Sequence, residues 1–89
     1  MASYLISYDL RKPDHDYSNL YAALSAYKAI RGLQSVWLLD SNQPSVGVRD
    51  TLMSHMHKID GLIVIEIGQN WGTHNVLNNA ADWLRLRRP

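Results

Sequence analysis

The stretch that decides the fold is Ser3–Leu10, Ser-Tyr-Leu-Ile-Ser-Tyr-Asp-Leu, which runs into Arg11-Lys12-Pro13-Asp14. Tyrosine, leucine and isoleucine favour a half-buried pleated strand, and a proline cannot continue the hydrogen-bond ladder. The pattern predicts a strand that ends near Leu10. Alternation divides it between two faces, one with Tyr4, Ile6 and Tyr8 and the other with Leu5, Ser7 and Asp9. Asp9 at the strand end is either an ordinary turn residue or part of a metal and phosphate site.

Five further elements follow from hydrophobic periodicity and from β-branched or aromatic runs. In chain order we expect a helix from Tyr17 to about Ile30, a strand at Leu33–Asp40, a helix from Ser45 to about Lys58, a strand at Gly61–Gly68, and a third helix that Thr73 caps. Asp16 is expected to accept a hydrogen bond from the amide of Ser18 or Asn19, and Gly32 is expected to end the first helix.

This order predicts a single α+β domain over residues 1–89. We favour a ferredoxin-like βαββαβ sandwich with an added C-terminal helix, in which one strand is short or merged into Leu33–Asp40. A parallel three-layer unit is the alternative, although 89 residues cannot easily cover a parallel sheet on both faces. The strand at Gly61–Gly68 is apolar on both sides, so helices should cover one face and a second copy the other. We therefore expect a homodimer in which the sheets meet.

The composition narrows the function classes. The chain has no cysteine, which excludes thiol catalysis and zinc sites built on thiolates. It has no apolar run of the ~20 residues that cross a bilayer and no signal-peptide pattern, so we expect a cytoplasmic protein without a membrane partner. The net charge is only +1, so nucleic-acid contacts would come from local patches, at Arg11 and Lys12 and at Arg85, Arg87 and Arg88. The last three also suit the negative end of a helix.

The histidines do not form a recognisable metal motif. His55 and His57 are two apart, and residues at that spacing point away from each other on a helix. His15 and His74 have no nearby residue in the sequence that completes a ligand set.

Several short motifs in chain order resemble the SinR-like family, which is related to the small CRISPR-associated endonuclease of spacer acquisition and to the VapD ribonucleases. The motifs are Tyr8-Asp9, Lys12-Pro13, Asp16-Tyr17, Leu20-Tyr21, Ser35-Val36-Trp37, Val48-Arg49-Asp50, Leu52, Ile59-Asp60 and Trp83-Leu84. Trp37 stands where the endonuclease family usually has phenylalanine. The resemblance implies a ferredoxin-like homodimer in which one Asp9 from each subunit flanks a divalent metal, Mg²⁺ or Mn²⁺, with Tyr8 and Arg31 near the substrate.

Two functions follow as expectations. The first is a homodimeric nucleic-acid-associated protein, with weak metal-dependent cleavage of RNA or DNA through Asp9, Tyr8 and Arg31. The alternative is a non-enzymatic protein-interaction module of a phage, toxin-antitoxin or defence system, in which Trp37, Trp71 and the strand at Gly61–Gly68 contact the partner. In both, Asp9 can still be no more than a turn residue.

Overall fold

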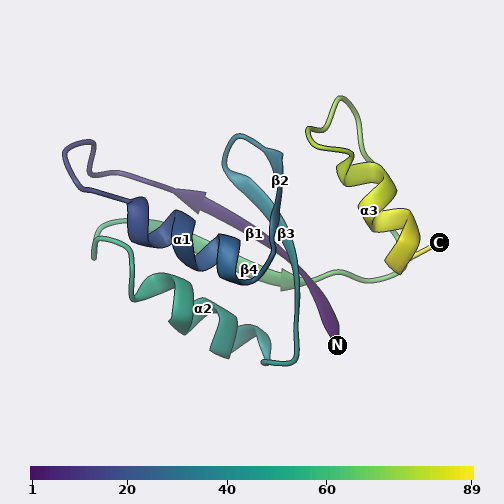
Figure 1. The fold of residues 1–89 in the computed structure, drawn as a ribbon, viewed down its shortest axis with the longest axis horizontal. Coiled ribbons are helices and arrows are strands. Elements are labelled where there is room, and N and C mark those ends of the chain that lie inside the picture. The colour runs from purple at the N-terminus through teal and green to yellow at the C-terminus, as the bar shows by residue number, and fades with distance from the viewer.

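The computed structural model describes residues 1–89 and contains one sheet and three helices (Figure 1). The elements are β1 (Ala2–Asp9), α1 (Ser18–Ala26), β2 (Ile30–Leu33), β3 (Val36–Ser41), α2 (Ser45–Met53), β4 (Gly61–Glu66) and α3 (Ala80–Arg87). The strand order is β2-β3-β1-β4, and every neighbouring pair is antiparallel. The α+β class is thereby confirmed, and the parallel alternative is wrong.

Helices α1 and α2 lie side by side on one face of the sheet, here called the inner face (Figure 1). The main core forms between them and the strands, and its buried members are Tyr4, Ile6, Tyr8, Leu20, Leu24, Leu39, Val48 and Leu52. The three β1 residues of this core are the ones that alternation assigns to a single face. The inner face therefore follows from the pattern of β1.

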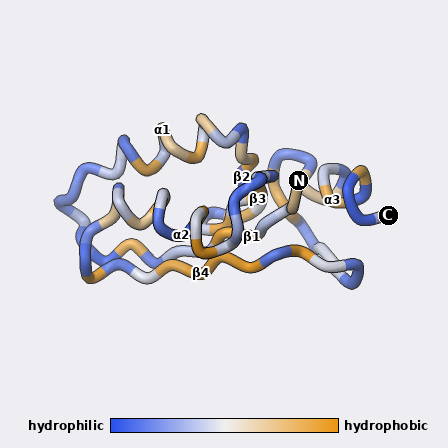
Figure 2. Tube along the Cα trace, turned by 90° about the horizontal axis from the view of Figure 1, so that it is seen from below, coloured by the Kyte–Doolittle hydropathy of each residue, from blue (hydrophilic) through white to orange (hydrophobic).

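The opposite, outer face is covered only in part. Helix α3 packs there through Ala80 and Leu84, which form a second cluster with Leu38. On the same outer face, but at the β4 edge of the sheet, Ile63 and Ile65 are 56% and 55% exposed. Figure 2 shows β4 as an apolar segment that α3 does not reach. Both faces of β4 are apolar as expected, but the protein itself buries only one of them.

The segment from residue 30 to residue 41 is a hairpin. Strands β2 and β3 are joined by a turn at Gln34 and Ser35, so the single strand expected at Leu33–Asp40 was wrong at its beginning. Leu33 belongs to the short β2, whose pairing with β3 shifts register between Arg31 and Leu33. A short strand beside Leu33–Asp40 was part of the expected element order.

Helix α1 ends at Ala26, well before Gly32. Lys28 adopts a left-handed conformation with φ of 58°, and the amides of Lys28 and Ala29 donate to the carbonyls of Ser25 and Leu24. This pair of hydrogen bonds is the Schellman arrangement, here built on lysine instead of glycine. The expectation that Gly32 stops the helix was therefore wrong. Gly32 lies within β2.

The other helix boundaries also differ from expectation. Helix α2 stops at Met53, and the amides of His55 and Met56 then close tighter turns onto Leu52 and Met53. Helix α3 begins at Ala80, so Thr73 does not cap it. Three asparagines at positions 75, 78 and 79 have φ of 54°, 54° and 56°, which interrupts helical geometry before Ala80. None of the helices has the length and apolar content to cross a bilayer.

The two faces of β4 should respond differently to charge. Val64 packs against the main core, whereas Ile65 is exposed on the outer face. Val64→Lys should therefore lower the free energy of unfolding by more than about 2 kcal/mol, because it drives an ammonium into the core. Ile65→Lys should change it by less than about 1 kcal/mol at low protein concentration. Urea titration of both variants measures this, and equal losses would contradict the assignment of faces.

Candidate functional site

A polar recess lies where β1 ends beside α1 and the β2–β3 hairpin. We call it the Tyr8 recess. Its volume is about 350 Å³, and its lining comprises Tyr8, Asp9, Leu10, Tyr21, Arg31, Gln34 and Ser35. The three residues expected to be catalytic, Asp9, Tyr8 and Arg31, thus all border one hollow. They come from two strands that are separated by α1 in the sequence.

The hydroxyl of Tyr8 is the polar centre of this recess. It accepts a hydrogen bond from Trp37 Nε1 at 3.0 Å and a longer one from Arg31 Nη2 at 3.3 Å. Tyr21 lies alongside: burial raises the pKa of Tyr21, and so does its hydrogen bond with Tyr8, while Arg31 opposes the rise. The Tyr21 hydroxyl therefore stays protonated at neutral pH, and the Tyr8 hydroxyl accepts from two donors.

Arg31 is held between aromatic rings. Its Cζ lies 4.6 Å from the Trp37 ring centroid and 5.4 Å from that of Tyr21. Arg31 pairs directly with Trp37 across the β2–β3 ladder, so both side chains point to the inner face. The hydrogen bond to Tyr8 raises the pKa of Arg31 despite its partial burial. The guanidinium is therefore a fixed, permanent positive charge.

The hydrogen-bonding capacity of Arg31 is largely unused. A guanidinium carries five N–H donors. Its Nε is buried and has no partner, and no carboxylate pairs with it. A buried donor without an acceptor costs about 1–3 kcal/mol. An anion beside Arg31 would meet a cation that the protein has positioned without neutralising it.

Asp9 borders the recess, but its carboxylate belongs to a different environment from the Tyr8 hydroxyl. Neighbouring residues of a strand point to opposite faces. The Asp9 side chain is 70% exposed and pairs with Arg11 Nε at 2.9 Å, beside a second hollow that includes Arg11 and Gly61. The structure therefore brings Tyr8 and Arg31 into contact but directs the Asp9 carboxylate elsewhere.

A divalent metal does not fit the donor groups of one chain. The only strong partner of Asp9 is a cation, and no group of three or more histidine, aspartate or glutamate side chains could hold a metal ion. Mg²⁺ and Mn²⁺ take several oxygen ligands. A carboxylate from a second copy would be needed, so the metal at Asp9 stays a prediction.

The basic residues predicted to bind nucleic acid fall at two ends of the molecule. Arg11 and Lys12 follow β1, near the recess, and pair with Asp9 and Asp14. The C-terminal arginines lie with α3, near the start of β1 (Figure 1). There Arg85 pairs with Asp82, Arg87 pairs with Asp40 and stacks on Trp83, and Arg88 donates to the Ile67 carbonyl. Among these five cations, only Arg88 lacks a carboxylate partner, as Arg31 does in the recess.

The sequence does not reveal that hydrogen bonds from three separate segments converge on Asp60. Its carboxylate accepts hydrogen bonds from the Arg11 amide at 2.7 Å, the Tyr17 hydroxyl at 2.7 Å and the His57 amide at 2.9 Å. Burial opposes its ionisation, but these donors prevail and lower its pKa. The only sequence signal is an isolated acidic residue immediately before an apolar strand.

The same loops bring two histidines together. The rings of His15 and His57 are 5.8 Å apart, a proximity that no spacing in the sequence indicates. His55 and His57 follow the end of α2, so helical spacing does not describe them. His57 Nδ1 accepts from the Ile59 amide at 3.3 Å, so this ring nitrogen is already engaged by the protein's own backbone.

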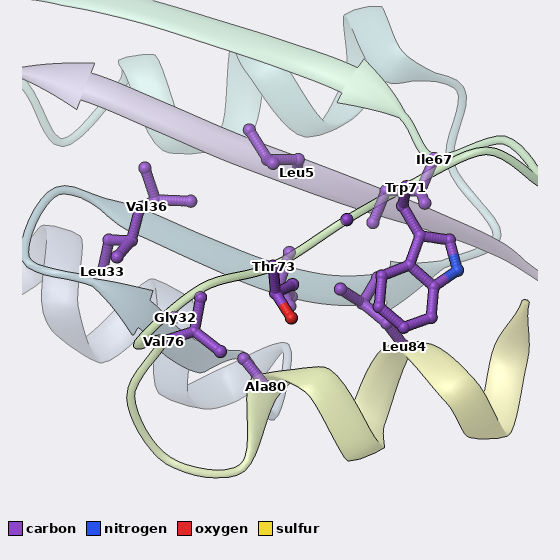
Figure 3. Close-up of a pocket in the computed structure, with 12 residues that line it drawn as sticks. Leu5, Gly32, Leu33, Val36, Ile67, Trp71, Thr73, Val76, Ala80 and Leu84 are labelled. Atoms are coloured by element: carbon purple, nitrogen blue, oxygen red, sulfur yellow. The ribbon is translucent and has the colours of Figure 1, made fainter.

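A second, apolar cavity of about 170 Å³ lies between the outer face and α3 (Figure 3). Leu5 and Val36 of the sheet face Ala80 and Leu84 of α3 across it, and Trp71 lies beside them. Leu38 also lines this cavity. It contains no titratable side chain. Trp71 is itself held by a hydrogen bond to the Arg88 carbonyl, as Trp37 is held by Tyr8. The candidate chemistry is therefore at the Tyr8 recess.

No protein-family model matches this chain, and no solved structure matches it. The fold and the recess define a small α+β protein with an antiparallel sheet and one basic, aromatic hollow at a strand end. The resemblance to the SinR-like family remains a prediction.

The charge of Asp60 should make stability depend on pH. A carboxylate with a lowered pKa contributes stability that is present above its ordinary value of 3.8 and is lost as pH falls through its folded-state pKa. Asp60→Asn should lower the free energy of unfolding by about 2 kcal/mol at pH 7, and the deficit should shrink below pH 4.

Urea titration at pH 7, 5, 4 and 3 measures the deficit. Asp9→Asn is the matched control, because Asp9 is exposed and paired only with Arg11, and it should cost less than about 1 kcal/mol. A deficit in Asp60→Asn that stays constant down to pH 3 would contradict the role given to its charge.

Proposed function

We propose that this chain is a homodimeric, nucleic-acid-associated protein of ferredoxin-like architecture that binds a backbone phosphate of single-stranded RNA or DNA in the Tyr8 recess. The observation that carries this proposal is Arg31, a cation fixed between two aromatic rings, whose guanidinium makes one hydrogen bond, from Nη2 to Tyr8, and has no carboxylate partner. Guanidinium groups suit phosphate because their planar forks donate paired hydrogen bonds.

The surroundings of Arg31 favour an unpaired strand over a duplex. Tyr21 is 37% exposed beside the guanidinium, so its ring offers a stacking surface for a base. Single-strand sites combine a basic groove with aromatic side chains, and each stacked base contributes about 1–3 kcal/mol. Arg11 and Lys12, in the loop after β1, supply further positive charge at this end, although acidic neighbours offset it.

The ferredoxin-like part of the proposal is supported by connectivity. A β-α-β-β-α-β order, an antiparallel sheet and two helices on one face are the features of that architecture. Helix α3 is an addition on the outer face. The exposed isoleucines of β4 support the homodimer, because apolar residues of this kind mark association surfaces.

Metal-dependent cleavage would be a further step of this function. One chain supplies a single carboxylate at the end of β1, so a Mg²⁺ or Mn²⁺ site would need Asp9 of the partner subunit beside Asp9. A bound metal would supply charge stabilisation and an activated water. The groups present in one chain, Arg31 and Tyr8, would hold and orient the phosphate.

The alternative function is a non-enzymatic protein-interaction module. Ile63, Ile65 and Leu33, all exposed, are the observation that favours it. Salt separates the two functions. Binding to single strands should weaken with a slope near ~0.7 per neutralised phosphate, whereas an apolar protein interface should respond little.

Removal of the Arg31 guanidinium should weaken nucleic-acid binding. We expect Arg31→Ala to reduce the affinity for a fluorescent single-stranded RNA or DNA by about tenfold or more, and Tyr21→Ala to reduce it by about fivefold or more. Fluorescence anisotropy at two salt concentrations measures both. Arg49→Ala is the matched control, because Arg49 lies on α2 and pairs with Asp50. Unchanged binding by folded Arg31→Ala protein would refute the proposal.

Cleavage is tested separately. If paired Asp9 carboxylates hold a metal, labelled RNA or duplex DNA should be cut with Mg²⁺ or Mn²⁺ but not with EDTA, and Asp9→Asn should abolish the cutting. The melting temperature should barely change, because Asp9 makes only an exposed ion pair. Binding through Arg31 without cleavage under any condition would restrict the function to binding.

A further inference from the structure

The two edge strands of the sheet, β2 and β4, differ in whether other parts of the chain form hydrogen bonds with their outer sides. At the β2 edge, the loop before α3 closes the strand: the Leu77 amide donates to the Gly32 carbonyl at 2.8 Å, and Asn78 Nδ2 donates to the Arg31 carbonyl at 3.0 Å. At the other edge, no strand or loop of the chain forms backbone hydrogen bonds with β4 on the side that faces away from β1. The protein therefore protects its shorter edge strand and leaves the longer one open.

The register shows which groups of β4 are free. The Ile67 amide donates to the Ser3 carbonyl, so odd-numbered residues of β4 direct their backbone groups toward β1. The backbone groups of the even-numbered residues, Leu62, Val64 and Glu66, consequently point away from the sheet. They form a ready template for another strand.

Nothing in β4 blocks such pairing. Its sequence, Gly-Leu-Ile-Val-Ile-Glu, has no proline, no lysine and no bulge, which are the devices that natural edge strands use against association. Ile63 and Ile65 are both more than half exposed on the outer face. An open, apolar edge strand of this kind is a site that another β-strand can occupy.

We propose that the occupant is a second copy of the same strand, so that two chains form one continuous eight-stranded antiparallel sheet across a two-fold axis at Val64. This inference rests on the homodimer proposed above and specifies its interface. Side chains alternate, so outer-face residues must pair with outer-face residues. The register centred on Val64 pairs all three free even residues and puts Ile63 opposite Ile65 of the partner subunit.

Charges along the same edge are complementary in this register. Glu66 has no cationic partner within its own chain, and it would lie opposite Leu62 of the partner subunit. The hollow beside Leu62 is lined by Lys58, which has no carboxylate partner, by Arg49 and Asp60, and by Met53, which is half exposed. In this register each of the two Glu66 side chains would approach Lys58 of the partner subunit.

The arrangement also sets the distance between the two Tyr8 recesses. Asp9 pairs with Gly61, which would lie opposite Ile67 of the partner subunit. Strand rise and spacing then separate the two Asp9 residues by more than about 20 Å. Each recess then faces nucleic acid on its own, and the two Asp9 carboxylates cannot flank one metal. This interface and the metal-dependent cleavage through paired Asp9 therefore exclude each other, and the cleavage assay with Asp9→Asn distinguishes them.

Cysteine cross-linking tests the register, because the natural chain has no cysteine. Ile63→Cys and Ile65→Cys are made in two chains of different length. In a non-hydrogen-bonded pair, positions 63 and 65 face each other directly, whereas 63 to 63 or 65 to 65 is a diagonal of about 7 Å or more, too long for a disulfide. We expect the mixed sample to shift to the mass of a heterodimer on a non-reducing gel, with little homodimer from either variant alone.

Charge reversal gives a second readout. Lys58→Glu and Glu66→Lys should each weaken the dimer about tenfold in sedimentation, and the double variant should restore it. A monomer at all concentrations, or a dimer in which homodimeric cross-links predominate, would overturn the interface. Anisotropy with Arg31→Ala reads the recess independently, so loss of the interface and loss of nucleic-acid binding can be told apart.

Discussion

The constraint on which the structure depends is the position of β1 between β3 and β4. Both edges of β1 are used in antiparallel pairing, so its register controls the whole sheet. Its alternating side chains then separate two clusters, with Tyr4, Ile6 and Tyr8 under the two helices and Leu5 under α3. A shift of one residue would exchange these faces and expose the main core.

The same alternation divides the chemistry at the end of β1. Tyr8 turns inward, where Arg31 and Trp37 reach its hydroxyl, and Asp9 turns outward, where Arg11 pairs with it. Residues adjacent in sequence therefore occupy different electrostatic environments. One is a recess with a positive charge that no carboxylate balances, and the other is an exposed ion pair.

The loops decide how far each surface is covered. The Asp60 carboxylate accepts hydrogen bonds from Arg11, Tyr17 and His57. It thereby joins the loop after β1 and the start of α1 to the loop before β4. At the other end, the segment before α3 closes the β2 edge and leaves β4 open. Because only the β2 edge is covered, the β4 edge is the one open to another chain.

The sequence by itself determined the order of strands and helices apart from the separate strand β2, the two faces of β1, the contact of Asp16 with Ser18 and the apolar character of β4, because these depend on neighbours a few residues apart. The resemblance to the SinR-like family drew attention to Tyr8 and Arg31. Only the tertiary structure decided the left-handed Lys28, the late start of α3, the role of Asp60 and the separation of the Asp9 carboxylate from the recess. These features depend on contacts between distant segments, whose geometry is set by packing and has no local pattern.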